Sequence, residues 1–294
     1  MKILIFGNSG LVGRELENYL IDLGYLIVGV SRNGKSNYNF DISNFDNFKQ
    51  ITEIPDIIIN CASILPTVSG ESFDAEYLKR LFEVNLIGGV NIVKWAELNN
   101  IKKIINLSTL SINQKPWSVP LAEDNSSLVT GVHTGYAMSK LCQEKMMTEV
   151  DIKKKITILH LRLSAVYGEE MKREGVLFFL QQFLNNNKNI EITNGVKTSF
   201  DFIHTKDICS VIAELLLVNI PSGVYNLGSE EEIKLIDLAK LLIKINGTNE
   251  QVLNNETKRE ISRASINCSK IKGYLGEGFS FIPLESGLKN IILS

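Results

Sequence analysis

Cysteine is scarce in this sequence, and the cysteines present lie far apart. They are Cys61, Cys142, Cys209 and Cys268, with no Cys-x-x-Cys pair and no histidine at ligand spacing. This pattern predicts reduced thiols rather than a disulfide framework, and it predicts no metal site. The six prolines are also scattered, so no Pro-rich linker divides the chain.

The sequence also lacks an excess of positive or negative residues. Lys and Arg number 31 and Asp and Glu 33, which gives a net charge of −2, and no run of five like charges occurs. This balance argues against a nucleic-acid partner. The longest apolar stretches are too short to cross a bilayer, and residues 1–6 lead into a glycine loop without the features of a secretory signal. We therefore expect a cytoplasmic protein with no membrane partner.

What the sequence does have is a regular alternation of strand-like and helical patterns. Hydrophobic residues make up 44% of the 294 residues, which allows a sizeable core. Apolar runs at 2–6, 25–30, 56–60, 103–107 and 156–163 alternate with helical spacing at 11–23, 74–99 and 136–150. This order predicts an α/β fold with a doubly wound parallel sheet. From about residue 167 the alternation loosens, which predicts a smaller, interleaved C-terminal α/β lobe.

A glycine loop follows the first expected strand and opens the first expected helix. Glycines at this junction allow a tight turn, close approach of the backbone to a pyrophosphate, and close helix–sheet packing. The phosphate charge would lie against free N–H groups at the helix N-terminus. The loop predicts a Rossmann-type dinucleotide site, although a glycine-rich turn without a ligand is the alternative. The residues expected around the pyrophosphate are Gly7, Ser9, Gly10, Leu11, Val12 and Gly13.

The residues after the second expected strand bear on the choice of cofactor. An NAD site usually has an acid there to hold the ribose 2′-hydroxyl. This chain has Ser31-Arg32 instead, with no acid between Tyr25 and Phe40. Since an arginine can pair with a 2′-phosphate, NADP(H) is favoured over NAD(H). The alternative is that Arg32 is a solvated loop residue.

Asp41-Ile42 follows a third short apolar run, where a carboxylate can accept a hydrogen bond from the adenine amino group. The alternative interpretation is that Asp41 is the N-cap of a helix over residues 43–51.

Tyr136 and Lys140 form a Tyr-x-x-x-Lys pair that shares one face of an expected helix. A lysine cation nearby, together with an oxidised nicotinamide, favours the phenolate and brings the phenol into the range of acid–base catalysis. Ser108-Thr109 stands at the C-terminal end of an expected strand, where open α/β sheets place their sites and a hydroxyl can bind a substrate oxygen. The alternative interpretation of Ser108-Thr109 is a polar strand end without a catalytic role. Cys61-Ala62-Ser63 follows another strand at the same edge, which suits small residues lying under a cofactor.

With these motifs, the sequence resembles an extended short-chain dehydrogenase/reductase of the NAD-dependent epimerase/dehydratase family, whose members modify nucleotide sugars. The motifs that carry the resemblance run nearly end to end: Gly7-x-x-Gly10-x-x-Gly13, Asn60-Cys61-Ala62, Asn85-Leu86-Ile87-Gly88, Ser108-Thr109, Tyr136-x-x-x-Lys140, Leu161-Arg162-Leu163, Val166-Tyr167-Gly168, Asp201-Phe202-Ile203-His204, Tyr225-Asn226-Leu227-Gly228 and Leu284-Glu285-Ser286-Gly287-Leu288.

The resemblance implies roles for particular residues. Thr109, Tyr136 and Lys140 would be the catalytic residues. The nicotinamide would lie near Leu163 and Val166, with Asn85, Leu107 and Ser108 also on the cofactor side. The family pattern implies a homodimer built from the helices near 74–99 and 136–150. It also implies a dinucleotide-binding domain of residues 1–165 plus about 201–228, and a substrate lobe of 166–200 and 229–294.

Departures from the family pattern narrow the expected reaction. Dehydratases carry an Asp-Glu pair where this chain has Leu110-Ser111, which argues against 4,6-dehydration. Many members have an arginine that clasps the nucleotide diphosphate where Phe200 stands here, so Arg259 or Arg263 is the candidate clamp. Ser111 and about Glu170 occupy the places of the cysteine and histidine that move protons in epimerising reductases.

His133, three residues before Tyr136, is a further candidate for the substrate pocket, although it would equally suit an exposed loop. The substrate-side candidates are therefore Ser111, His133, Phe200, Arg259 and Arg263. Together the sequence predicts an NADP(H)-preferring oxidoreductase that reduces a 4-keto nucleotide sugar. The alternatives are a 4-epimerase with retained NAD and a non-catalytic dinucleotide-sensing protein.

Overall fold

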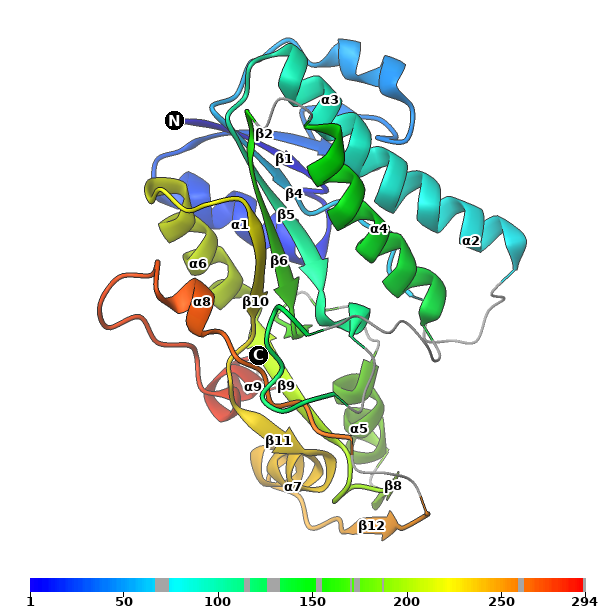
Figure 1. Cartoon of the computed structure of the whole chain (residues 1–294). Coiled ribbons are helices and arrows are strands. Elements are labelled where there is room, and N and C mark those ends of the chain that lie inside the picture. Colours follow the sequence, from blue (N-terminus) through cyan, green and yellow to red (C-terminus); the bar gives the residue numbers. More distant parts are fainter. Residues whose placement is uncertain are drawn as a thin grey trace.

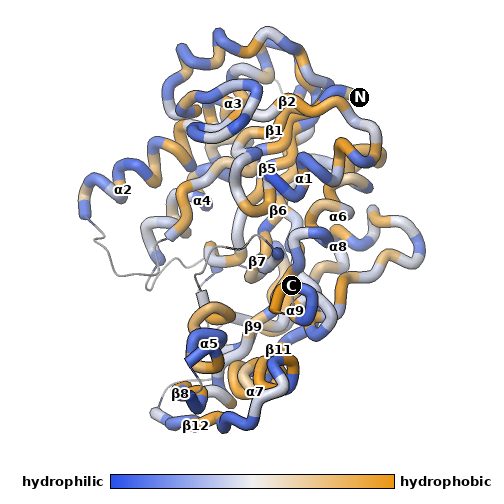
Figure 2. Tube along the Cα trace, turned by 180° about the vertical axis from the view of Figure 1, so that it is seen from behind, coloured by the Kyte–Doolittle hydropathy of each residue, from blue (hydrophilic) through white to orange (hydrophobic). Residues whose placement is uncertain are grey.

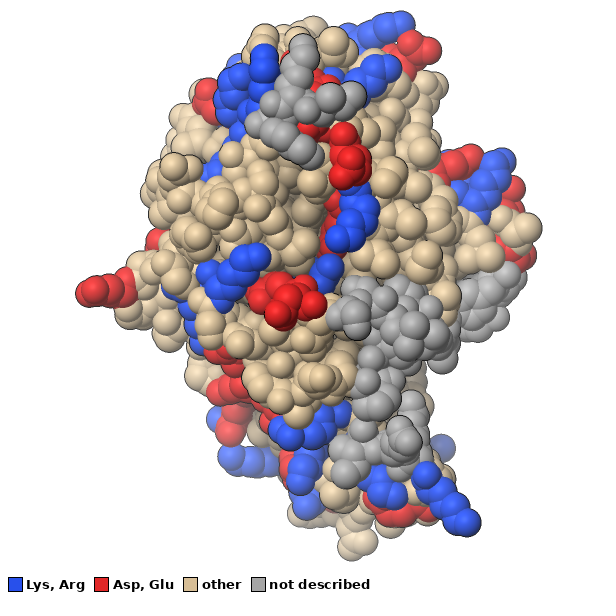
Figure 3. Space-filling model, viewed as in Figure 1, with Lys and Arg blue, Asp and Glu red and all other residues tan. Residues whose placement is uncertain are grey.

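The structure is a computed structural model in which a seven-stranded sheet and a lobe with two smaller sheets lie one beyond the other along the molecule (Figure 1). It describes residues 1–66, 74–113, 117–125, 133–151, 155–169, 171, 175–186, 188–258 and 262–292. In this part of the chain, no helix is long and apolar enough to cross a membrane. Residues of both charge signs lie side by side over the described part of the face in Figure 3.

The larger sheet has seven strands in the order β10-β6-β5-β4-β1-β2-β3, and every neighbouring pair is parallel. Its strands are β1 (Lys2–Phe6), β2 (Leu26–Ser31), β3 (Tyr38–Asn39), β4 (Ile57–Asn60), β5 (Lys103–Thr109), β6 (Thr157–Leu163) and β10 (Gly223–Leu227). The predicted doubly wound parallel sheet is therefore confirmed.

Helices cover both faces of this sheet because successive strand residues point to opposite sides. On β1, Ile3 and Ile5 pack with helices α1 (Leu11–Asp22) and α6 (Thr205–Leu217), whereas Leu4 and Phe6 pack on the other face. That second face is covered by α3 (Gly88–Leu98) and α4 (Thr134–Val150). Figure 2 shows the resulting hydrophobic strands between helices with hydrophilic outer turns.

The predicted helix over residues 74–99 is formed but is not uniform. It runs from α2 (Ala75–Leu81) through a π-helical turn, η2 (Phe82–Ile87), into α3. A π-helical turn changes the direction in which side chains leave the helix and is frequent at functional sites. Here it carries Asn85, which is fully buried.

The smaller lobe has its own hydrophobic core. A three-stranded sheet of β7 (Ala165–Tyr167), β9 (Ser199–His204) and β11 (Glu232–Lys234) lies beside the pair β8 (Ile190–Thr193) and β12 (Val252–Asn255). Tyr167, Leu180, Leu242 and Leu288 are among the core residues. The helices of this part are α5 (Gly175–Asn185), α7 (Leu235–Asn246) and α9 (Leu284–Ile292), whereas α8 (Ser269–Lys272) packs against β10 of the larger sheet.

The chain crosses several times between the larger sheet and the smaller lobe, as the prediction of an interleaved lobe requires. Strand β9 pairs with β7 and β11, whereas α6 contacts α1 and β10 pairs with β6. Residues 201–204 therefore lie in the smaller sheet, although the predicted domain division grouped them with the dinucleotide domain. We now propose that the segment returning to the larger domain begins at Thr205.

Candidate active site

The carboxyl ends of β1, β4 and β5 bring the glycine loop and the candidate catalytic residues to one edge of the large sheet. Gly7 follows β1, Cys61 follows β4 and Thr109 ends β5. Backbone hydrogen bonds tie these ends to their neighbours, because Gly7 N donates to Val30 O at 2.7 Å and Cys61 N donates to Phe6 O at 2.8 Å. Ligands of open α/β sheets bind at this edge.

A cavity of about 190 Å³ opens there. Ten of the residues predicted to bind the cofactor line it: Gly7, Ser9, Gly10, Ser31, Arg32, Asp41, Ile42, Cys61, Ala62 and Ser63. Leu11, Val12 and Gly13 form the first turn of α1 beside it. The sequence analysis missed four lining residues: Val30, Phe40, Ile64 and Val84. These are apolar, and their positions in the sequence are those of ordinary core residues.

The glycine loop fits a pyrophosphate. Gly7 has φ +80°, and a Cβ there would lie 2.6 Å from Ala62 N. A Cβ on Gly13 would lie 2.2 Å from Gly7 O. The close approach of α1 to the loop therefore requires glycine at residue 13. At Gly10, the N-cap of α1, no side chain caps the helix and the first turn has no acid. The N–H groups of that turn can therefore receive an anion.

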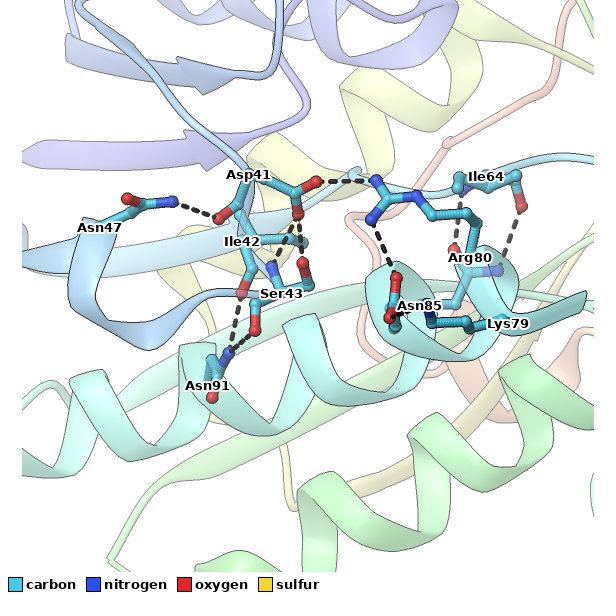
Figure 4. Close-up of polar contacts among 10 residues, drawn as sticks. Asp41, Ile42, Ser43, Asn47, Ile64, Lys79, Arg80, Asn85 and Asn91 are labelled. Carbon is cyan, nitrogen blue, oxygen red and sulfur yellow. Dashed lines mark hydrogen bonds and ion pairs between the residues drawn. The ribbon is translucent and has the colours of Figure 1, made fainter. Parts of the chain in front are cut away.

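Asp41 lies at the other end of the cavity and is held by three hydrogen bonds (Figure 4). Its carboxylate accepts from Ser43 N at 2.9 Å, from Ser43 Oγ at 2.7 Å and from Arg80 Nη2 at 2.7 Å. Burial raises the pKa of Asp41, but the bonds from Ser43 and Arg80 outweigh it and leave the pKa below its ordinary value. Asp41 is thus an ionised acceptor on the cavity wall.

The alternative interpretation of Asp41 as a helix N-cap is wrong. The short helix η1 (Phe45–Gln50) begins later, and Asn44 caps it by accepting from Asp46 N. Arg80, which lies 39 residues from Asp41 in the chain, was missed because no local pattern pairs a helix residue with so distant a carboxylate.

Ser31 and Arg32 line the same cavity, where Ser31 is buried and hydrogen-bonded within its loop and Arg32 is exposed. Ser31 Oγ donates to Asn33 O at 2.6 Å and lies 2.7 Å from Ser36 Oγ, so it fastens its own loop. Ser36 in turn donates to Asn8 Oδ1 at 2.7 Å. Arg32 is exposed at the cavity edge. A guanidinium in that position can pair with a phosphate.

Helix α4 carries the candidate catalytic pair on its buried face. Burial raises the pKa of Tyr136 to about 12. The hydroxyls of Thr109 and Ser63 lie near the phenol and act to lower its pKa, but desolvation is the largest effect and outweighs them. The expected effect of Lys140 together with an oxidised nicotinamide stays a prediction. The phenol is protonated at neutral pH.

Lys140 is almost completely buried, at 1% exposure. Its Nζ donates to Leu107 O at 2.8 Å and to Gln143 Oε1 at 2.5 Å. Burial lowers the pKa of Lys140 to about 8, while the carboxylate of Glu144 acts in the opposite direction. The ammonium form is thus retained at neutral pH by a small margin.

Asn85 and Ser108 join other parts of the site to helix α4 through hydrogen bonds. The Asn85 side chain accepts from Ile64 N at 2.8 Å and donates to Ile64 O at 3.1 Å and to Ser139 Oγ at 2.9 Å. It therefore ties the cavity wall to α4. Ser108 Oγ donates to Glu144 at 2.6 Å, and Glu144 forms a buried ion pair with Arg162 at 2.8 Å. The Ser108 hydroxyl thus contacts α4.

Leu163 and Val166, expected near the nicotinamide, pack at the C-terminal end of β6 and on β7 within or against the main hydrophobic cluster. Leu107 contributes to the site through its carbonyl oxygen, which accepts from Lys140.

The substrate-side candidates do not all come together. Ser111 is exposed and accepts a hydrogen bond from Thr109 Oγ1 at 3.1 Å, and His133 stands at the N-terminus of α4. Phe200 instead stacks on Phe202, with ring centroids 5.6 Å apart, and packs against the core of the smaller lobe. Arg263 pairs with Glu232 at 2.6 Å. Arg259 and Glu170 lie outside the described residues.

Comparison with known proteins gives a consistent family. The model of the NAD dependent epimerase/dehydratase family matches residues 3–228. Protein CapI of Staphylococcus aureus is 23% identical over 281 residues, covering 82% of each chain. The dTDP-4-dehydro-6-deoxyglucose reductase of Escherichia coli is 22% identical over 261 residues, covering 82% of this chain and 80% of that protein.

The fold is shared with solved structures over nearly the whole chain. RMD from Pseudomonas aeruginosa, solved in complex with NADPH, has a TM-score of 0.83 at 21% identity, covering 99% of this chain and 97% of that one. Other similar proteins are named as 4,6-dehydratases and 4-epimerases, several of them solved with NAD. At these identities, the solved structures establish the fold.

Proposed function

The chain belongs to the NAD-dependent epimerase/dehydratase family, whose members modify nucleotide sugars with a nicotinamide dinucleotide, and we propose that it reduces a 4-keto nucleotide sugar with NADPH. The observation that carries the proposal is the arrangement of Thr109 at the end of β5 with the buried Tyr136 and Lys140 on one face of α4, at the carboxyl edge of the sheet.

Reduction of a ketone needs a hydride at carbon and a proton at oxygen. A nicotinamide dinucleotide, when held in the cavity, would supply the hydride. Tyr136 donates its proton to the substrate oxygen, which becomes the product hydroxyl. Thr109 turns its hydroxyl hydrogen from Ser111 to that oxygen and donates a hydrogen bond as negative charge develops on it. The phenolate left behind is stabilised by the Lys140 ammonium on the same helix face and is then reprotonated from solvent.

The surroundings of Thr109 favour reduction over elimination of water. Elimination requires an acid and a base beside the sugar carbons. Leu110 is buried and apolar, and Ser111 offers a hydroxyl bonded to Thr109. The cysteine–histidine pair expected for epimerising reductases is also replaced, by Ser111 at one place. His133 at the start of α4 and Ser111 are the residues that we propose to contact the sugar.

We also propose that the cofactor is NADP(H). Arg32 is the cation at the cavity edge, and the carboxylate of Asp41 in the cavity wall is already paired with Arg80. A 2′-phosphate would therefore meet a free guanidinium and little repulsion.

Replacing Arg32 with alanine should narrow the preference for NADPH over NADH. One charge-assisted phosphate contact contributes about 1.5–3 kcal/mol, so the affinity ratio should fall roughly 10-fold or more. Titration of both cofactors, followed by fluorescence, measures this ratio. Lys35→Ala is the matched control, because Lys35 is an exposed cation of the same loop that does not line the cavity. Equal affinities in the unaltered protein, or an equal effect of Lys35→Ala, would overturn this cofactor assignment.

A homodimer through α2, α3 and α4 is the oligomeric state that we propose. Ile87 on η2 and Met138 and Met146 on α4 are large apolar residues exposed to 44%, 36% and 42%. Burial of such residues against a second copy would remove apolar surface from water.

If this dimer forms, light scattering at micromolar protein concentration should give twice the monomer mass of 32.9 kDa. A monomer mass would exclude this interface.

The activity test follows the oxidation of NADPH with a 4-keto-6-deoxy nucleotide sugar. Tyr136→Phe keeps the ring but removes the donated proton, so turnover should fall by at least about 10²-fold with cofactor affinity nearly unchanged. Thr109→Val should also lower turnover more than affinity, because its hydrogen bond strengthens with the developing charge. Tyr225→Phe is the control, because that hydroxyl donates to Pro221 O outside the site.

Two results would contradict the proposal. Wild-type turnover in Tyr136→Phe would remove the phenol from the reaction. Isomerisation of a nucleotide sugar by a tightly retained NAD, with no net consumption of NADPH, would identify a 4-epimerase instead.

A further inference from the structure

Helix α4 buries several polar side chains on the face that it turns to the sheet. Lys140, Gln143 and Glu144 are 1%, 0% and 2% exposed. Burying such groups is unfavourable unless each finds hydrogen-bond partners. Lys140 has its place in the proposed reaction and Glu144 pairs with Arg162. The burial of Gln143 is explained by neither the proposed reaction nor this ion pair.

The amide of Gln143 lies between Lys140 and the backbone of the π-helical turn η2. Its Oε1 accepts from Lys140 Nζ at 2.5 Å and from Asn106 Nδ2 at 3.2 Å. Its Nε2 donates to Asn85 O at 2.5 Å. An ammonium can only donate and a carbonyl can only accept, so the chemistry of both neighbours requires this orientation of the amide.

Asn106 extends the contact into a buried chain of amides. Its Nδ2 lies 3.1 Å from His160 Nδ1, and its Oδ1 accepts from Asn60 Nδ2 at 2.8 Å. Burial lowers the pKa of His160 to about 4, so this imidazole is neutral and adds no charge beside Lys140. The partners of Gln143 are thereby held in place by strands β4, β5 and β6.

Other ionisable groups surround Lys140, but none replaces Gln143 as its direct acceptor. Tyr136 and Glu144 come from α4, Cys61 follows β4, and His160 and Arg162 come from β6. The Glu144 carboxylate is engaged by Ser108 and Arg162. Burial raises the pKa of Cys61 to about 12, so that thiol is neutral. In the described part of the chain, Lys140 Nζ donates to Gln143 Oε1 and Leu107 O.

We propose that Gln143 is a positioning residue whose amide oxygen holds the Lys140 ammonium in place and whose amide nitrogen anchors that arrangement to Asn85 on the π-helical turn. Two donor directions of the ammonium are then used by the protein, which leaves the third for the cofactor side of the site. The consequence for catalysis rests on the proposed function, whereas the contact with Lys140 does not.

The direct test measures the charge state of Lys140 in the cofactor-free protein. Lysine labelled with ¹³C at Cε reports the titration by NMR, and Lys140→Met identifies the signal. Gln143→Met keeps the length of the side chain but removes the acceptor, so the apparent pKa of Lys140 should fall by about one unit or more, the size expected for one lost hydrogen bond to a charged group. Gln143→Glu places a carboxylate there and should move it upward.

Asn91→Leu is the matched control. Asn91 is also a buried amide, on α3, but its hydrogen-bond partners differ: it donates to Ile42 O and Ser43 O, which belong to the segment after β3. This variant should lower stability without moving the Lys140 titration. An unchanged titration in folded Gln143→Met would overturn the proposal. If that variant does not fold, a titration in Gln143→Glu that stays unchanged or moves downward would overturn it instead.

Kinetics separate this inference from the proposed function. If reduction is the activity, the alkaline limb of kcat/KM should move to lower pH in Gln143→Met, whereas a merely structural role would lower activity equally at every pH. If the chain had no reductase activity, the NMR titration would still decide the role of Gln143.

Discussion

Burial of one ammonium group, that of Lys140, constrains the rest of the site. A charge in a low-dielectric interior must be matched by hydrogen bonds, and two of these come from Leu107 O at the end of β5 and from Gln143 on α4. The first bond fixes α4 against the sheet, and the second ties Lys140 to the turn that carries Asn85. Tyr136 lies one helical turn away on the same face, so the position of the phenol follows from that of the ammonium.

The same contacts join the cofactor half of the site to its catalytic half. Asn85 binds both backbone groups of Ile64, a residue of the cavity wall, and also Ser139 on the catalytic helix. Its place in a π-helical turn lets one side chain reach both elements. Ser63, next in the same wall, donates to Asn85 Oδ1 at 3.2 Å. A displacement of the wall would therefore also act on the catalytic helix.

Local spacing made much of this predictable. The loop from Gly7 to Gly13, the Tyr136–Lys140 pair and the polar end of β5 at Thr109 each depend on residues close in sequence. The Asp41–Arg80 ion pair and the contact of Gln143 with Asn85 join residues 39 and 58 positions apart, and no pattern within either segment points to its partner. Spacing shows the Lys140 cation one turn from Tyr136 but not the depth of burial, which raises the pKa of the phenol. Phe200, expected on the substrate side, is partly buried and packs against the core of the smaller lobe, and its contact with a substrate stays a prediction.

Proton donation by a neutral Tyr136 is the central claim, and titration of this phenol tests it most directly. Tyrosine labelled with ¹³C at Cζ, with Tyr136→Phe to identify the signal, reports its ionisation by NMR in the cofactor-free protein. The account predicts that Tyr136 stays neutral beyond the ordinary tyrosine pKa of about 10, because burial raises its pKa to about 12. A phenolate already formed at neutral pH would contradict it, since the site would then hold a base ready for oxidation rather than an acid ready for reduction.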